Sequence, residues 1–282
     1  MISQKEVRDE ALLRNVPANT VDKDYVLGHF INCLFAENWA QENFIFKGGT
    51  CLKKCYFQDY RFSEDIDITI VNNDFILLKS HLLFICKKIT EQTNILFNLL
   101  AFEEQFYNDI MVGWNASICF WGANHSKNEI PRFSKECHTK IDFDFRNYEM
   151  IIMPTAIKSI YHTYSDFEII NSMVPCYSIE EILSEKLRAI LQRNRGEARD
   201  YFDLWYIKNN IVNIDWNLVK SAFFEKCKFK DIKFQSVDDF FIPKRLQQVE
   251  ITWDKRLKHQ LPFDVDRDAV MADLKIFLKS LF

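Results

Sequence analysis

The sequence predicts an α+β fold, with a small mixed sheet and flanking helices in its N-terminal part and a mainly helical C-terminal part. Short alternating or apolar segments typical of strands gather between residues 43 and 145, whereas helical spacing dominates after Pro175. Pro154 and Pro175 bracket this change of pattern. We therefore expect one domain over residues 1–165 and a second, mainly helical domain over residues 166–282.

The N-terminal domain is predicted to begin with helices and to continue with strands. A strong helix is expected over residues 21–38. Apolar or alternating segments then predict strands over residues 43–46, 65–70, 95–103, 110–121 and 140–145, with a short helix near residues 52–56 and an apolar helix over residues 74–89. Together these elements predict a small sheet with helices.

A Gly-Gly turn directly follows the first predicted strand. Gly48 and Gly49 supply a turn without Cβ atoms, and Thr50 is expected to cap the helix that follows. Backbone N–H groups at such a turn attract anions, and the missing side chains let a phosphate oxygen come close. An ordinary tight turn would have the same sequence, so the turn predicts a phosphate site only in combination with other features.

Two carboxylates follow on one face of a strand. Strict alternation over residues 65–70 sends the isoleucines to one face and Asp65, Asp67 and Thr69 to the other. Carboxylates roughly 6.5 Å apart along a strand repel each other unless a cation or proton intervenes. Mg²⁺ prefers carboxylates together with substrate phosphate oxygens, which a nearby glycine turn would place. A solvated acidic face of an edge strand is the alternative.

The C-terminal domain carries a lysine inside an apolar helical stripe. Ser178 and Glu181 form a predicted capping box, and the helix that follows places Lys186 among isoleucines and leucines. A buried ammonium needs an anionic partner, such as a triphosphate or an active-site aspartate. The alternative is a lysine whose stem packs while its charged end reaches water.

Further carboxylates occur on two other predicted elements. Asp200 and Asp203 share one side of the next helix, and a solvated acidic face explains that spacing as well. Asp142 and Asp144 share one face of the last predicted strand. Asp142 is a candidate third carboxylate of the same site, with an edge strand as the alternative.

Two groups of motifs carry a family resemblance. One is Lys47-Gly48-Gly49-Thr50-x-Leu52-x-Lys54 followed by Arg61-Phe62-Ser63-Glu64-Asp65-Ile66-Asp67, and the other is Glu181-x-x-x-Glu185-Lys186-Leu187-x-Ala189 followed by Arg199-Asp200-x-x-Asp203-Leu204. They resemble the AbiEii/AbiGii-type, MenT-like toxins, which are nucleotidyltransferases of the DNA polymerase β superfamily. The resemblance implies a polymerase β-like core, with the C-terminal part contributing Lys186 and an aspartate to the active-site cleft.

The resemblance also implies residue roles and a reaction. Asp65 and Asp67 would hold Mg²⁺ or Mn²⁺, and Lys186 would bind phosphate. Asp200 best matches the essential aspartate of the second motif, with Asp203 as the other candidate. Asp142 would be the base that accepts the proton of the attacking hydroxyl. The nucleotide-binding residues would be Gly48, Gly49, Thr50, Lys54, Ser63 and Lys186. The implied activity is transfer of NMP from an NTP to an RNA, at the 3′ end of tRNA, by the toxin of a toxin–antitoxin or phage-defence module with a cognate antitoxin. One alternative is that the acceptor is a protein hydroxyl instead of RNA. The other is that the protein is a non-catalytic nucleotide-binding module.

Composition limits the partners and the compartment. The net charge is −4, so a tRNA footprint would have to be a local basic patch, for which the lysines and arginines between Lys226 and Lys258 are candidates. No apolar run is long enough to span a bilayer and the start lacks a signal-peptide core, so we expect a cytoplasmic protein without a membrane partner. The eight cysteines are expected to be reduced and mostly buried.

Overall fold

The computed structural model describes residues 1–125, 131, 133, 139–193 and 196–282. The chain divides into two compact units. Unit 1 comprises Met1–Glu149 and Thr155–Cys176, and unit 2 comprises Met150–Pro154 and Tyr177–Phe282. None of the described helices is both long enough and apolar enough to cross a membrane.

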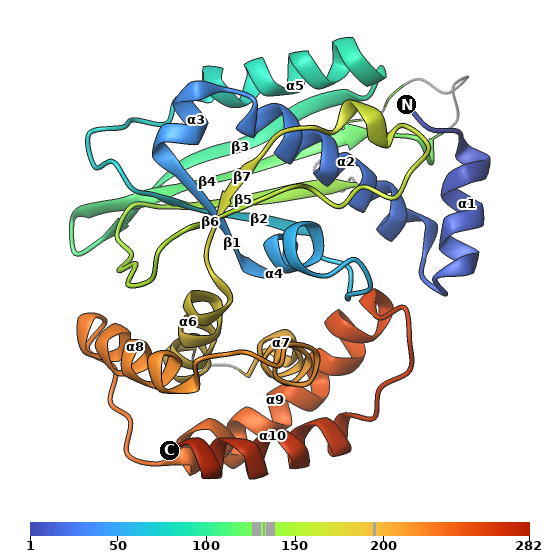
Figure 1. Cartoon of the computed structure of the whole chain (residues 1–282). Helices are drawn as coiled ribbons and strands as arrows, with labels where there is room; N and C mark the ends of the chain where they lie inside the picture. Colours follow the sequence, from blue (N-terminus) through green and yellow to red (C-terminus); the bar gives the residue numbers. More distant parts are fainter. Residues whose placement is uncertain (126–130, 132, 134–138, 194–195) are drawn as a thin grey trace. The chain divides into compact units, whose positions relative to one another are not determined.

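Unit 1 is built on a seven-stranded mixed sheet (Figure 1) with the order β3-β4-β5-β2-β1-β7-β6. The strands are β1 Phe44–Lys47, β2 Asp65–Ile70, β3 Leu96–Tyr107, β4 Ile110–Trp121, β5 Lys140–Arg146, β6 Ala156–Lys158 and β7 Val174–Cys176. β2 runs parallel to β5 and β1 runs parallel to β7, whereas the other neighbours are antiparallel. The predicted α+β fold with a mixed sheet is confirmed.

Helices cover one face of this sheet. The helices of unit 1 are α1 Gln4–Leu13, α2 Ala18–Phe35, α3 Asn38–Asn43, α4 Gly48–Cys51 and α5 Lys79–Thr93, with a π-helical turn at Leu52–Tyr56 and a 3-10 turn at Phe167–Ile169. α2 and α5 pack against each other and against β5 and β3 (Figure 1). Phe30 of α2 contacts Phe143 of β5, with ring centroids 4.7 Å apart. Strand alternation therefore turns Asp142 and Asp144 away from this apolar layer.

Two helices have different boundaries from those predicted. The helix expected over residues 21–38 is α2, which begins directly after Pro17 and ends at Phe35. The helix expected from residue 74 is α5, which begins only at Lys79 and ends at Thr93, followed by Asn94 in the left-handed conformation. Proline before a first turn and a left-handed asparagine after a last turn are both common helix boundaries.

Unit 2 is helical over most of its length. Its helices are α6 Ile179–Gln192, α7 Ala198–Asn210, α8 Trp216–Phe229, α9 Pro243–Thr252 and α10 Arg267–Leu281, with short turns at Val237–Phe241, Trp253–Leu257 and Lys258–Gln260. The Ser178 hydroxyl accepts a hydrogen bond from the Glu181 N–H at 3.3 Å, so the predicted N-cap is confirmed.

The other half of the predicted capping box is wrong. The Glu181 carboxylate accepts hydrogen bonds from the N–H groups of Ile152 and Met153, at 3.1 and 2.9 Å. It also lies 2.5 Å from the Lys226 ammonium. Glu181 is fully buried, and a buried carboxylate requires such partners. It therefore anchors the Met150–Pro154 segment to α6 instead of capping the helix.

Candidate active site

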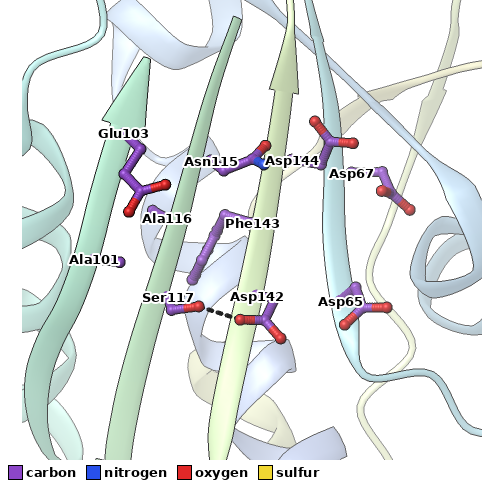
Figure 2. A pocket seen from close by; sticks show the side chains of 10 residues that line it. All are labelled: Asp65, Asp67, Ala101, Glu103, Asn115, Ala116, Ser117, Asp142, Phe143 and Asp144. Carbon is purple, nitrogen blue, oxygen red and sulfur yellow. Dashed lines mark hydrogen bonds between the residues drawn. The ribbon is translucent and has the colours of Figure 1, made fainter. Parts of the chain in front are cut away.

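The two carboxylates of β2 lie beside two carboxylates of β5. In the parallel register Asp65 pairs with Asp142, and Asp67 pairs with Asp144. Figure 2 shows Asp65 and Asp142 at one level of the sheet and Asp67 and Asp144 at the next. They line a cavity of about 460 Å³ together with Ala101, Glu103, Asn115, Ala116, Ser117 and Phe143. The sheet therefore presents a strongly acidic hollow on the face opposite α2.

The carboxylates of β5 have cationic or hydroxyl neighbours. The Ser117 hydroxyl donates to Asp142 Oδ1, and Lys140 Nζ lies 3.1 Å from Asp142 Oδ2. Arg146 Nε lies 2.5 Å from Asp144 Oδ1. Lys140 and Arg146 therefore lie against the two carboxylates of β5, and like charges that close together favour a cation between them.

The Gly-Gly turn lies directly against this strand. β1 pairs antiparallel with β2 so that Lys47 is opposite Asp67, and Gly48 then turns the chain with φ +80°. A Cβ on Gly48 would lie 2.0 Å from Asp67 Oδ2. A Cβ on Gly49 would lie 2.6 Å from an Arg61 nitrogen and 3.0 Å from the Ser63 hydroxyl. Both glycines are therefore needed for close packing, and the structure brings Gly48, Gly49, Ser63 and Asp67 together.

Thr50 contacts β2 but does not cap a helix. α4 begins at Gly48 with Lys47 as its N-cap residue, so Thr50 lies inside the helix. Its hydroxyl donates to the backbone carbonyl oxygen of Asp65. The predicted cap is wrong because the helix begins three residues earlier than a Thr50 cap would place it. Thr50 instead holds the turn against the strand that carries the two aspartates.

The second group of predicted residues converges within unit 2. Lys186 of α6 places its Nζ 2.5 Å from Asp203 Oδ2 and 3.2 Å from Asp200 Oδ1 on α7. Arg193 lies 2.6 Å from the other oxygen of Asp200. Asp203 is fully buried and Asp200 is 5% exposed, so the alternative of a solvated acidic face is wrong.

The sequence profile described as nucleotidyl transferase AbiEii toxin, type IV toxin–antitoxin system, matches residues 32–274 of this chain. The chain belongs to the AbiEii nucleotidyltransferase toxin family. The match spans both units and includes the residues of the acidic cavity, the Gly-Gly turn and the Lys186 contacts. This AbiEii protein is therefore a nucleotidyltransferase, and its family is that of toxins paired with an antitoxin.

Solved structures agree with the AbiEii fold. MenT4, a nucleotidyltransferase toxin from Mycobacterium tuberculosis H37Rv, is 17% identical with a TM-score of 0.60, and the match covers 100% of this chain and 99% of MenT4. JHP933 from Helicobacter pylori is 14% identical with a TM-score of 0.57, covering 94% of this chain and 93% of that one. The search of curated proteins found no match.

Lys54 of this AbiEii protein lies in the core of unit 1. Its Nζ is 2.6 Å from Asp24 Oδ2, which also accepts a hydrogen bond from the Tyr164 hydroxyl at 2.8 Å. Burial lowers the pKa of Lys54, and Asp24 opposes that effect. Burial raises the pKa of Asp24, but the charges of Lys54 and Lys53 and the hydrogen bonds outweigh burial and lower it. This geometry does not support Lys54 as a phosphate ligand.

Some residues of the AbiEii cavity were not singled out from the sequence. Glu103 and Asn115 lie on the β3-β4 hairpin and reach the same face as the aspartates. Alternation along each predicted strand places them on one face or the other, but only the pairing of β4 with β5 identifies the face that lines the cavity. Strand register was therefore the missing signal.

Replacing Gly48 with Ala is expected to reduce the activity of this AbiEii enzyme much more than its stability. The added Cβ would collide with Asp67 Oδ2, so the carboxylate would have to turn away from its present position. The positive φ adds strain of roughly 1–2 kcal/mol. We expect a loss of about 100-fold in the transfer rate, by analogy with misplacing a catalytic group by 1 Å. Steady-state rates and a urea unfolding curve measure the two effects, and a fully active variant would contradict the close approach.

Proposed function

We propose that this enzyme transfers NMP from an NTP to an RNA acceptor, the 3′ end of tRNA, with Mg²⁺ or Mn²⁺ as the metal. One observation carries the proposal: the Asp65–Asp67 pair lies directly against the Gly48–Gly49 turn. A carboxylate pair binds a hard cation, and a turn without side chains admits phosphate oxygens. A metal-bound triphosphate requires both at one place.

The side chains on this face fit a hard divalent ion. The donors near Asp65 and Asp67 are carboxylate, hydroxyl and amide oxygens, which are the ligands of Mg²⁺ and Mn²⁺. Among the described residues, two groups of potential metal ligands converge within 4.8 Å, and neither includes Asp65 or Asp67. The carboxylates of the acidic face therefore do not form a closed cage around one point. Mg²⁺ is usually held by one or two carboxylates with water and substrate phosphates, so no closed cage is needed.

The remaining chemistry consists of positioning and charge. A bound divalent ion would neutralise charge on the triphosphate as pyrophosphate leaves. Asp65 and Asp67 would hold the ion, Gly48 and Gly49 would let the outer phosphates approach the backbone, and Ser63 and Thr50 would support the turn. Such a reaction needs few reactive groups from the protein.

Asp142 is proposed as the base that takes the proton of the attacking hydroxyl. Its register partner is Asp65, so it lies beside the proposed metal position. Ser117 donates to one of its oxygens, which orients the carboxylate. A base must be within hydrogen-bond reach of the proton it accepts, and a neighbouring strand provides that reach.

Lys186 is proposed to bind phosphate, as the family motif implies. Its contacts with Asp200 and Asp203 hold the ammonium in one place. We assign Asp203 to this positioning role, because it is fully buried and makes the shorter contact. Asp200, which also contacts Arg193, stays the candidate for the essential aspartate of unit 2.

The basic surface proposed for RNA is smaller than the sequence indicated. Lys226 is buried against Glu181, and Arg245 donates to the carbonyl oxygens of Asp239 and Leu191. The exposed members of this group are Lys228, Lys233, Lys244, Lys255, Arg256 and Lys258. We propose these exposed residues for contact with the RNA backbone, which would make binding sensitive to salt.

Labelled NTPs test the proposed reaction. The purified protein is incubated with each labelled NTP, Mg²⁺ and either total tRNA or a protein extract, and the products are separated by size. Label in the tRNA range that is lost after removal of the 3′-terminal nucleotides supports the proposal. Label in protein alone would replace the acceptor by a protein hydroxyl, and no label in either would contradict NMP transfer under these conditions.

The cellular role follows from the same proposal. A toxin that modifies tRNA would act in the cytoplasm, where NTPs and tRNA are present, and its antitoxin would prevent growth inhibition. Phage defence is the proposed setting for such a pair. Co-expression of the neighbouring antitoxin should restore growth of a host in which this chain alone is toxic.

A further inference from the structure

A buried group of two histidines and one aspartate lies in unit 1, apart from the residues that line the acidic cavity. His29 is on α2, and His162 and Asp166 are in the segment that connects β6 to β7. One ligand atom from each of the three lies within 4.8 Å of the others. The proposed nucleotidyl transfer uses none of them.

Two of the separations in this group are close to an edge of a tetrahedral metal site. His29 Nε2 lies 3.3 Å from Asp166 Oδ2, and His162 Nε2 lies 3.1 Å from Asp166 Oδ1. With metal–ligand bonds of about 2.0 Å, ligand atoms of a tetrahedral zinc site are roughly 3.3 Å apart. Each histidine nitrogen therefore lies about one tetrahedral edge from an oxygen of Asp166, and the three ligand atoms converge within 4.8 Å.

Within the described part of the chain, three of the four ring nitrogens of His29 and His162 lack the hydrogen bonds that burial normally demands. His29 is fully buried, and neither of its ring nitrogens has a hydrogen-bond partner among the described residues. His162 Nδ1 also lacks one. Buried polar atoms are nearly always satisfied, and leaving one unsatisfied is destabilising. A ligand that accepts nitrogen lone pairs would remove this cost at His29 Nε2.

The packing leaves one nitrogen of His162 to serve as a ligand. A Cβ on Gly28 would lie 2.5 Å from His162 Nδ1, so the backbone of α2 covers that nitrogen. His162 Nε2 instead faces Asp166. The Tyr25 hydroxyl donates to Asp166 Oδ2 at 2.7 Å and accepts from the Ile2 N–H at 3.2 Å. Such outer hydrogen bonds orient a ligating carboxylate.

We propose that His29, His162 and Asp166 bind one divalent ion of the zinc class, with water as the fourth ligand. Two imidazoles and one carboxylate are a common zinc set, whereas Mg²⁺ takes oxygen ligands, so the two sites select different metals. The ion would join α2 to the segment before β7. The bound ion would stabilise unit 1 while keeping one position open to water, and its binding does not depend on the proposed function.

The cysteines supply a rival site that the test must separate. Cys51, Cys55 and Cys176 are buried, and their sulfur atoms also lie within 4.8 Å of one another. Cobalt(II) reports its ligands by absorption, because thiolates add an intense ultraviolet charge-transfer band that imidazole and carboxylate do not. The Cys51→Ala, Cys176→Ala double variant removes that cluster while leaving the histidines in place.

The experiment titrates Co²⁺ and then Zn²⁺ into the metal-stripped full chain. The wild type and the double cysteine variant should both bind one equivalent of Co²⁺ with visible tetrahedral bands and no thiolate band. His162→Gln and Asp166→Asn should each weaken binding by more than about 100-fold, beyond what changes outside the ligand set usually cause. His259→Gln, which changes an exposed histidine of unit 2, should bind as the wild type does.

Thermal unfolding gives a second readout. Zn²⁺ should raise the Tm of the wild type and of His259→Gln, because an ion that binds only the folded chain stabilises it, and it should leave the Tm of His162→Gln and Asp166→Asn unchanged. Circular dichroism checks that both ligand variants fold. A thiolate band, an absence of binding to the wild type, or unchanged affinity in folded His162→Gln or Asp166→Asn would overturn the proposal.

Discussion

Replacing Asp67 with Asn is expected to reduce nucleotidyl transfer by on the order of 10³-fold, at the upper end of the effect of removing one group that stabilises charge in a transition state. Asp67 faces the Gly48 turn and lies beside Asp144, so its charge is central to the proposed metal site. Asparagine keeps the shape but lacks the charge that holds a divalent ion. The measurement is the initial rate of label transfer at saturating Mg²⁺.

The same variant should fold at least as well as the wild type. Removing one of several neighbouring carboxylates relieves repulsion, so the urea midpoint should stay the same or rise. Asp65→Asn is expected to have the same effects on the transfer rate and on the urea midpoint. Glu104→Gln is the matched control, because this exposed carboxylate of β3 is not among the residues that line the cavity. A folded Asp67→Asn variant with the wild-type rate would contradict the role of this strand.

Replacing Lys54 with Met is expected to lower the free energy of unfolding by about 3–5 kcal/mol, the usual effect of breaking a buried ion pair from one side. Methionine fills a similar volume, but it leaves the Asp24 carboxylate, which is 4% exposed, without the ammonium 2.6 Å away. The hydrogen bond from the Tyr164 hydroxyl and the charge of Lys53 remain, but neither replaces the lost contact with the Lys54 ammonium. Urea unfolding followed by circular dichroism measures the change.

A second substitution separates the two roles considered for Lys54. Asp24→Asn in the Lys54→Met background removes the unpaired charge and should recover part of the lost stability. Nucleotide affinity should be the same in the wild type and in the folded double variant. A stable Lys54→Met protein with weakened nucleotide binding would show that Lys54 binds phosphate, as its place in the sequence motif implies.

Local sequence pattern predicted the elements better than it predicted their partners. The alternation at residues 65–70 and 140–145 correctly predicted two strands, each with its aspartates on one face. Side-chain direction along a strand depends only on the strand itself. That Asp142 would lie beside Asp65 depends on a parallel pairing across 77 residues, which no local pattern encodes. The resemblance to the family supplied the third carboxylate, and register then placed it.

Buried charges were the hardest feature to predict. The spacing of Asp200 and Asp203 is that of an exposed helix face, and only the ammonium of Lys186 on α6 explains their burial. Lys54 and Asp24 are 30 residues apart, and Glu181 and Lys226 are 45 apart. Each such charge is tolerated in the core because of a partner that sequence spacing does not reveal.

The most direct test of the central claim is binding of a non-hydrolysable NTP analogue measured by isothermal titration calorimetry. The claim is that Asp65, Asp67 and the Gly48 turn together bind a metal–nucleotide complex. The wild type should bind the analogue with Mg²⁺ present and bind it much more weakly with the metal chelated, whereas the Asp65→Asn, Asp67→Asn double variant should bind weakly in both conditions. Equal Mg²⁺-dependent affinity in the wild type and the folded double variant would contradict the claim.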